Sequence, residues 1–239
     1  DFGATSVQAG RFYNRYESYS GYFDGLLVHR GDAATGVGLA VGLRPQRSNE
    51  HPIASTPQVS GFAHYRTDNL GPLDYRVNGS YHEVRPRDAR PTHRYVGLTQ
   101  QVEWGPVSVR QDLQVDQDPA GGLRPSRFLV HAHADPLDWL RLRAHYTRRE
   151  PYYLHDPTTP FGALRAEVGG GASLLLPMGT LGGEVTALQP TGPFASATVY
   201  RARFSVPTVA YGLGLYGYGS LRTRAVQDVT LGTVGVSKR

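Results

Sequence analysis

Residues 140–147 read Leu-Arg-Leu-Arg-Ala-His-Tyr-Thr, so apolar and polar residues follow each other in strict alternation. Neighbouring side chains of an extended strand point to opposite faces. One face of this stretch therefore carries a polar row and the other an apolar row, made of Leu140, Leu142, Ala144 and Tyr146. Such alternation predicts a β-strand with two chemically different faces.

The same alternation recurs over most of the chain. It is clear in residues 73–82, 128–134, 200–206 and 209–215, where apolar residues alternate with polar or small ones. We expect strands at 5–12, 22–30, 35–44, 58–66, 73–83, 94–104, 107–116, 127–134, 138–148, 163–175, 180–188, 195–205, 208–218 and 225–236.

The expected connections are of two kinds. The short ones are 31–33, 68–72, 105–106, 135–137, 177–179 and 206–207. The others are polar and on average longer, at 13–21, 45–57, 84–93, 117–126, 149–162, 189–194 and 219–224. The two kinds alternate along the chain, so up-and-down strands would carry every short turn at one end and every longer loop at the other.

Short turns at one end and longer loops at the other are typical of the transmembrane barrels of bacterial outer membranes. The sequence therefore predicts a single all-β domain over residues 1–239. We expect a closed antiparallel up-and-down transmembrane β-barrel of about 14 strands, within a range of roughly 12–16.

The composition excludes several other classes. With 39% hydrophobic residues and 19% charged residues in a chain of 239, the sequence is too apolar for a disordered protein. Mean hydropathy is −0.39, and no apolar run approaches the ~18 residues of a spanning helix. The absence of Cys excludes disulfides and thiolate metal sites. The net charge of +5 is spread along the chain, which does not indicate nucleic-acid binding.

The composition of the two rows indicates which one would face lipid. The apolar rows are rich in Ala and Gly and would underfill a soluble core, whereas lipid tails fill such gaps. We therefore expect the leucines of the apolar rows (Leu140, Leu142, Leu213 and Leu215) to face lipid. Aromatic residues near strand ends (Tyr75, Tyr81 and Trp104) suit the two membrane interfaces. Trp139 is out of phase with this pattern, which suggests a bulge.

The N-terminal segment adds a family resemblance. Ala9-Gly10-Arg11-Phe12 and Phe23-Asp24-Gly25-Leu26 resemble the Gly-Arg and Asp-Gly hairpin of bacterial porin-like and alginate-export-type barrels. The resemblance is limited to this hairpin, and it implies that Arg11 and Asp24 lie near a channel. Barrels of that class commonly end in an aromatic residue, whereas this sequence ends Val236-Ser237-Lys238-Arg239.

The polar rows would line the interior of such a barrel. The expected pore-lining residues are Arg66, Arg76, Arg110, His131, His133, Arg141, Arg143, His145, Arg165, Arg201 and Arg203. Fewer carboxylates share these rows, namely Glu103, Asp112, Asp116, Glu167 and Glu184. A water-filled passage with this excess of cations would favour anions. Alternatively, charge pairs fill the interior of a structural barrel.

Neither a metal site nor a catalytic site is expected. His131 and His133 share a face, but the next strand brings Arg141, Arg143 and His145 to it, and cations repel a metal ion. No Gly-x-Ser-x-Gly elbow is present. The run at 169–171 is Gly-Gly-Gly without a following Lys-Ser/Thr, so it suggests a bend or bulge rather than a phosphate loop.

The leading functional hypothesis is a porin-like channel of the bacterial outer membrane, neither an enzyme nor a cofactor protein, that passes small polar or anionic solutes. Its expected partners are membrane lipid and lipopolysaccharide. One alternative is a structural outer-membrane barrel that anchors, or is plugged by, other envelope proteins. Another is a soluble β-rich binding protein. A need for detergent to stay in solution would distinguish both membrane barrels from the soluble binding protein. Conductance across a planar bilayer would distinguish the channel from the structural barrel.

Overall fold

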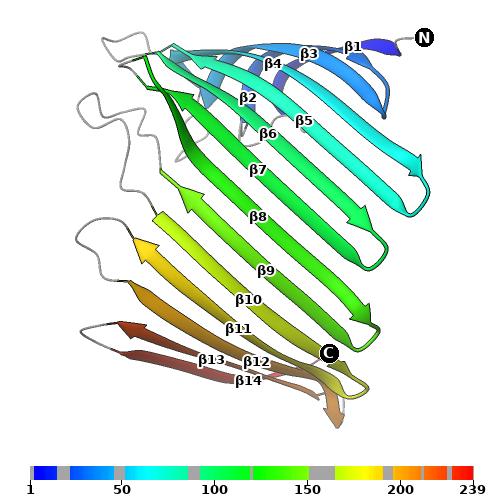
Figure 1. Cartoon of the computed structure of the whole chain (residues 1–239), viewed down its shortest axis with the longest axis vertical. Helices are drawn as coiled ribbons and strands as arrows, with labels where there is room; N and C mark the ends of the chain where they lie inside the picture. The colour runs from blue at the N-terminus through cyan, green and yellow to red at the C-terminus, as the bar shows by residue number, and fades with distance from the viewer. Residues whose placement is uncertain are drawn as a thin grey trace. The chain divides into compact units, whose positions relative to one another are not determined.

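A computed structural model of the chain describes residues 3–14, 22–45, 52–85, 92–118, 121–150, 165–190, 196–210, 213–224 and 228–238. These residues form one sheet of 14 strands, and the spatial order of the strands follows the sequence (Figure 1). Each pair with a defined register is antiparallel. Among the described residues, no helix is long and apolar enough to cross a membrane.

The strands are β1 (Ala4–Tyr13), β2 (Tyr22–Gly31), β3 (Thr35–Pro45), β4 (Pro52–Leu70), β5 (Leu73–Val84), β6 (His93–Trp104), β7 (Val107–Gln117), β8 (Leu123–Leu137), β9 (Leu140–Arg149), β10 (Arg165–Leu176), β11 (Gly179–Pro190), β12 (Ala197–Ala210), β13 (Leu213–Arg224) and β14 (Val229–Lys238). The predicted all-β class, strand number and up-and-down order are confirmed. In this order β1 and β14 stand at the two ends, and the described strands include no pairing between them, so closure stays a prediction.

Two predicted turns were wrong in position. The turn expected at 135–137 lies at Asp138–Trp139, because β8 continues through Pro136. Trp139 therefore lies in a turn, where the alternation of strand side chains does not apply. This position explains why Trp139 is out of phase with the apolar row, and the predicted bulge is not present there. The turn expected at 206–207 was also misplaced, because β12 continues to Ala210. Pro207 lies in a register irregularity between Val206 and Ala210, where a missing N–H breaks no ladder bond.

These shifts moved the last strands as well. The predicted strand 208–218 is divided between β12 and β13, and the loop predicted at 219–224 is the end of β13. The segment around Tyr211 and Gly212 lies outside the described residues. β4 also begins earlier than expected, at Pro52, because the ladder resumes with the pair Pro45 and Pro52 beyond an irregularity.

The tight turns after β4 and β6 share one device. Gly71-Pro72 and Gly105-Pro106 occupy the two turn positions, and the glycines have φ of 68° and 53°. A positive φ at the first central position, with no side chain to clash, is what a two-residue hairpin turn of primed type needs. These Gly-Pro pairs therefore set the ends of two hairpins.

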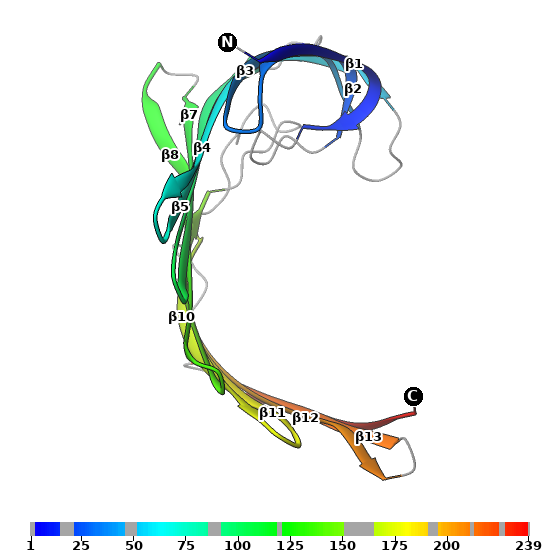
Figure 2. The same cartoon turned by 90° about the vertical axis from the view of Figure 1, so that its right-hand side faces the viewer.

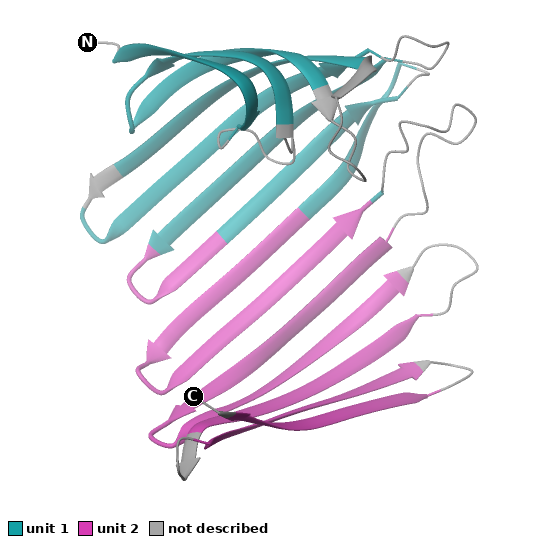
Figure 3. Ribbon diagram, turned by 180° about the vertical axis from the view of Figure 1, so that it is seen from behind, with its two compact units in different colours: residues 1–103, 110–128, 150–162 teal, residues 104–109, 129–149, 163–239 magenta. Residues whose placement is uncertain are grey.

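The chain divides into two compact units (Figure 3). Unit 1 comprises residues 1–103, 110–128 and 150–162, and unit 2 comprises residues 104–109, 129–149 and 163–239. The single domain that the sequence predicts over residues 1–239 stays a prediction.

In unit 1 the sheet has an exposed apolar face and a buried face. The apolar face carries exposed side chains from β1 to β6: Val7, Leu26, Val28, Val37, Leu39, Val41, Val59, Tyr65, Tyr81 and Val96. The opposite, polar face carries the buried side chains of Gln58, Ser60, His64, Ser80, His82, His93, Thr99, Asp112 and Asp116. A soluble β-domain has the reverse arrangement, with its apolar side chains buried.

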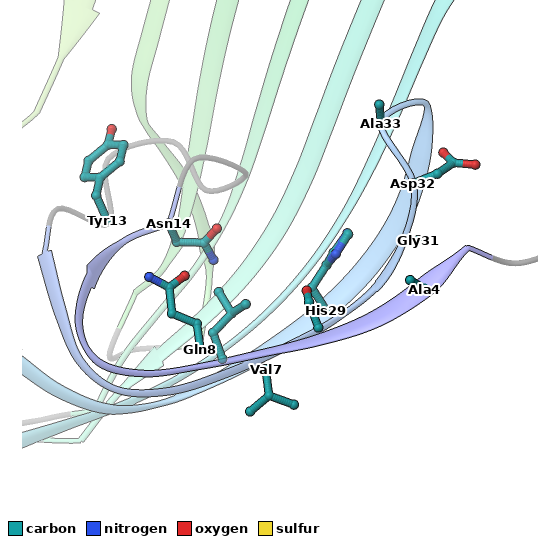
Figure 4. A pocket seen from close by; sticks show the side chains of 11 residues that line it. Ala4, Val7, Gln8, Tyr13, Asn14, His29, Gly31, Asp32 and Ala33 are labelled. Carbon is teal, nitrogen blue, oxygen red and sulfur yellow. The ribbon is translucent and has the colours of Figure 1, made fainter.

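The first strands of unit 1 bend strongly along their length (Figure 2). Val7 points to the outer side of this bend, while Gln8 and His29 lie on its inner side (Figure 4). The inner side also holds the hydrophobic core, formed by Phe12, Phe23, Leu27, Ala40 and Phe62. Along β1 to β4, the inner face of the sheet therefore carries a cluster of apolar side chains beside its polar ones.

Unit 2 repeats the two-face pattern. Its apolar face carries exposed side chains, namely Leu142, Val168, Leu181, Val185, Tyr200, Leu213, Leu221, Val234 and Val236. Strand register places Leu140 and Leu215 on the same face, so all four leucines expected on the apolar face lie there. The opposite, polar face buries Ser173 and Thr186. β14 departs from the pattern, since exposed Val229 and Leu231 share the polar face.

Candidate channel-lining surface

On the polar face of unit 1, two predicted arginines share one carboxylate. Arg66 on β4 and Arg76 on β5 are directly opposite in the ladder. The Oδ2 atom of Asp74 lies 2.6 Å from Nη2 of Arg76 and 3.5 Å from Nη2 of Arg66. All three side chains are partly exposed. Asp74 was not counted among the inward carboxylates, although it belongs to the same polar row, and it compensates one of the two charges.

Arg110 belongs to a second cluster, on β7. Its Nε donates to Oδ2 of Asp112 at 3.2 Å, and the hydroxyl of Thr99 donates to Oδ1 of the same carboxylate at 2.8 Å. Asp112 is buried, whereas half of the Arg110 side chain is exposed. The arginine therefore presents its charge to solvent while it compensates a buried anion.

A buried network of rings and polar groups lies beside this cluster. His82 and His93 both stack on Tyr95, with ring centroids 4.3 and 4.8 Å away. Nε2 of His93 contacts a carboxylate oxygen of Asp116, which is fully buried. Nε2 of His82 lies 3.0 Å from the hydroxyl of Ser80.

The Ser80–His82 pair does not form a Ser-His-Asp triad. The other ring nitrogen of His82 faces the amide of Gln58, at 3.2 Å, and Asp116 contacts a different histidine. His82 has no exposed surface. This network fits a packed interior rather than an accessible nucleophile.

On the polar face of unit 2, Glu184 holds two predicted arginines. Its Oε1 lies 2.9 Å from Nη1 of Arg201, and its Oε2 lies 3.4 Å from Nη2 of Arg143. Arg143 is on β9 and Glu184 on β11, with Gly171 of β10 directly between them in the ladder. Because Gly171 has no side chain, the ion pair can pass over β10.

The glycine run at 169–171 was predicted to form a bend or bulge, and this was wrong. β10 keeps regular register with β9 and β11 throughout the run. A Cβ on Gly169 would come within 2.5 Å of the His145 ring. The run instead leaves room for side chains that reach over β10.

The histidines of β8 pair locally. His133 Nε2 lies 3.0 Å from Oδ1 of Asp135, and Nε of Arg141 lies 3.7 Å from the same oxygen. His131 stacks on His145, with ring centroids 6.2 Å apart, and Nε2 of His145 lies 3.5 Å from Glu167. Among the described residues, no group of three or more His, Asp or Glu side chains is arranged to hold a metal.

The remaining predicted residues carry charge at other points of this face. Nη2 of Arg203 donates to the hydroxyl of Ser173 at 3.4 Å. Arg165 is exposed at the start of β10, opposite Arg149 in the ladder. All the predicted residues thus lie on polar rows of their own unit, but most of the arginines contact carboxylates, including Asp74 and Asp135, which the sequence count omitted.

Two features of unit 1 were not found from the sequence. A pocket of about 640 Å³ is lined by Ala4, Ser6, Val7, Gln8, Tyr13, Asn14, Leu27, His29, Gly31, Asp32 and Ala33 (Figure 4). The Nε2 atoms of His29 and His64 lie 3.0 Å apart. In the β2–β3 turn, backbone N–H groups of Thr35 and Ala34 lower the pKa of Asp32. Only the strand register, which brings β2 and β4 to β3, reveals the histidine pair.

The Gly-Arg and Asp-Gly hairpin pairs as its sequence suggests. Nε of Arg11 lies 2.6 Å from Oδ1 of Asp24, and the two residues are directly opposite on β1 and β2. The adjacent pair Phe12 and Phe23 points into the core, so alternation puts Arg11 and Asp24 on the apolar face. The resemblance implied a position near the channel, and the structure places the pair on the opposite face.

No protein-family model matches the chain, and no curated protein matches it. Among solved structures, it is similar to the crystal structure of Pseudomonas aeruginosa OccK11 (OpdR), at 12% identity and a TM-score of 0.49, over 98% of this chain and 78% of that chain. A likeness of this size carries no functional conclusion.

Proposed function

We propose that the chain forms a closed β-barrel in the bacterial outer membrane and acts as a porin-like channel for small polar or anionic solutes. One observation carries the proposal: in each unit one face carries exposed apolar side chains, while the opposite face holds arginines, histidines and carboxylates. The apolar face suits contact with lipid, and the polar face suits an aqueous barrel interior.

Strand length supports a transmembrane sheet. A tilted strand of about 9–11 residues crosses the hydrocarbon layer. The strands range from 10 residues, as in β1, to 19 residues in β4. Closure between β1 and β14 is part of the proposal, because an open sheet edge in lipid would leave backbone N–H and C=O groups unpaired.

The charges on the polar faces give the proposed selectivity. The proposed lining residues are Arg66, Arg76, Arg110, His131, His133, Arg141, Arg143, His145, Arg165, Arg201 and Arg203. Paired carboxylates reduce the positive potential without removing it, since Asp74 and Glu184 each compensate one of two nearby arginines. We expect a weak preference for anions.

A structural barrel is the second candidate, and the same pairing favours it. Ion pairs such as those around Asp74 and Glu184 can brace an interior across strands. In that case the barrel would anchor other envelope proteins or be plugged by them, and it would conduct no solute.

A liposome-swelling assay tests the proposal. The protein is inserted into phospholipid vesicles, which are diluted into isosmotic sugars or small carboxylates. We expect swelling that slows as solute size increases, with small anions entering faster than cations of equal size. If the protein inserts into the vesicles but causes no swelling, the channel is refuted and the structural barrel is supported instead. Protein that stays soluble without detergent and does not enter vesicles would refute both membrane functions.

A further inference from the structure

One cluster of charged side chains lies on the apolar face of unit 1. Glu83 is directly opposite Val59, which in turn is opposite Val41 and then Leu26 across the neighbouring strands. These three residues are apolar and exposed. Glu83 therefore places a charge beside a row of exposed apolar side chains, at the end of β5 that precedes the long connection to β6.

Two arginines meet at this carboxylate. Nε of Arg85 contacts Oε1 of Glu83, and Nε of Arg94 lies 3.2 Å from Oε2. The hydroxyl of Tyr81 donates to the same carboxylate at 3.2 Å. The backbone N–H of Arg85 donates to the carbonyl of Pro57, at 2.9 Å, so its position is fixed by the neighbouring strand.

The cluster carries one excess positive charge, and its cations are accessible. The arginine side chains are 67% and 44% exposed, whereas Glu83 is only 12% exposed. Each guanidinium has five N–H donors in a planar fork. Nε of each arginine is used by Glu83, and Nη1 of Arg94 also donates to Oε1 of Gln117 at 3.5 Å. The exposed terminal N–H donors that these contacts do not use are available to a ligand at the apolar face. Paired guanidinium groups suit the oxygens of a phosphate.

The depth of the cluster indicates which phosphate it would meet. Tyr75 and Glu83 are on the same face of β5. At a rise of ~3.3 Å per residue and a tilt of ~40°, they are separated by about 20 Å of membrane thickness. The apolar band of an outer-membrane barrel is ~25 Å tall and is bordered by aromatic residues. With Tyr75 near one border, Glu83 and its arginines reach the other, where lipid headgroups lie.

We infer that Arg85 and Arg94, held by Glu83, form a binding site for a phosphate group of lipopolysaccharide in the outer leaflet. The inference rests on the proposed function, because it needs the apolar face to lie in an outer membrane with the longer loops outside. Charge complementarity selects this occupant: an exposed cationic pair at the border of an apolar surface matches a lipid whose phosphates lie directly above its acyl chains.

Native mass spectrometry in a neutral detergent can measure the binding. The full chain is titrated with bis-phosphorylated lipid A, monophosphoryl lipid A and phosphatidylcholine. We expect affinity to fall in that order, and to fall further between 0.1 and 1 M salt as the Debye length shrinks from ~10 to ~3 Å. The double change Arg85→Gln and Arg94→Gln should weaken lipid A binding about tenfold, whereas Arg94→Lys, which keeps the charge but loses the planar fork, should weaken it less.

A matched control comes from the same face. Arg30 is an exposed arginine near the short β2–β3 turn, and Arg30→Gln should leave lipid A affinity within about twofold. Circular dichroism confirms that each variant remains folded. Equal lipid A binding by the double variant and the parent, or equal binding of lipid A and phosphatidylcholine, would overturn this site. If the parent also fails to enter vesicles, the proposed function itself fails.

Discussion

At the scale of single residues, glycines and aromatic rings form cross-strand pairs. Gly217 on β13 is directly opposite Phe204 on β12, and a Cβ at this glycine would lie 2.2 Å from the ring. Gly38 and Phe62 repeat the arrangement on β3 and β4, with a corresponding distance of 2.3 Å. The ring covers backbone that the glycine leaves bare, as aromatic rescue does in designed sheets. Many glycines in this chain are therefore partners of specific rings.

Changing Gly217 to Ala tests this pairing. The new methyl group would force the Phe204 ring out of its place, and we expect a loss of about 1–3 kcal/mol in the free energy of unfolding. Gly219 is the matched control, because it lies two residues along on the same face and a Cβ there meets nothing within 4 Å. Urea unfolding from lipid vesicles measures both. Equal effects of the two changes would show that the ring contact does not matter.

At the scale of strands, ion pairs cross from one element to the next. Glu184 on β11 joins Arg143 of β9 over the bare backbone of Gly171, and it joins Arg201 directly opposite on β12. Because each of the three side chains is partly exposed, water screens these pairs. The cluster therefore fixes the direction of the arginines more than it stabilises the sheet.

Changing Glu184 to Gln should free both arginines. We expect the stability to fall by about 1 kcal/mol or less, and the permeability ratio of chloride to potassium to rise. Glu167→Gln is the comparison, because Glu167 lies on the same face and pairs with His145, at 3.5 Å. Reversal potentials measure both variants. An unchanged ratio in the Glu184 variant would indicate that these arginines do not line a passage.

The strand pattern was readable from the sequence because side-chain alternation is local. The exceptions occur at prolines, since Pro52, Pro136 and Pro207 lie within strands although each suggested a connection. The compensation of Arg66 and Arg76 by Asp74 follows from the register of β4 and β5, and local pattern does not supply register. The pair of His29 and His64 could not be predicted for the same reason, because the two side chains meet across β3 and their contact depends on strand register.

At the scale of the whole molecule, the two faces of the sheet distinguish a membrane protein from a soluble one. Val234 and Thr233 are neighbours in the middle of β14, both exposed, and they point to opposite faces. Val234→Arg should cost about 2–4 kcal/mol in lipid vesicles, and Thr233→Arg much less. Equal costs for the two arginines would contradict the assignment of faces.

Conductance across a planar bilayer tests the central claim most directly. We predict discrete channel openings and, under a salt gradient, a reversal potential that indicates anion preference. The preference should weaken as the Debye length shrinks from ~10 Å at 0.1 M to ~3 Å at 1 M salt. Joint replacement of Arg141 and Arg143 by Gln should shift selectivity toward cations without unfolding the protein. Inserted protein that conducts nothing would contradict the channel, and a cation preference in the parent would show that ion pairs have neutralised the arginines.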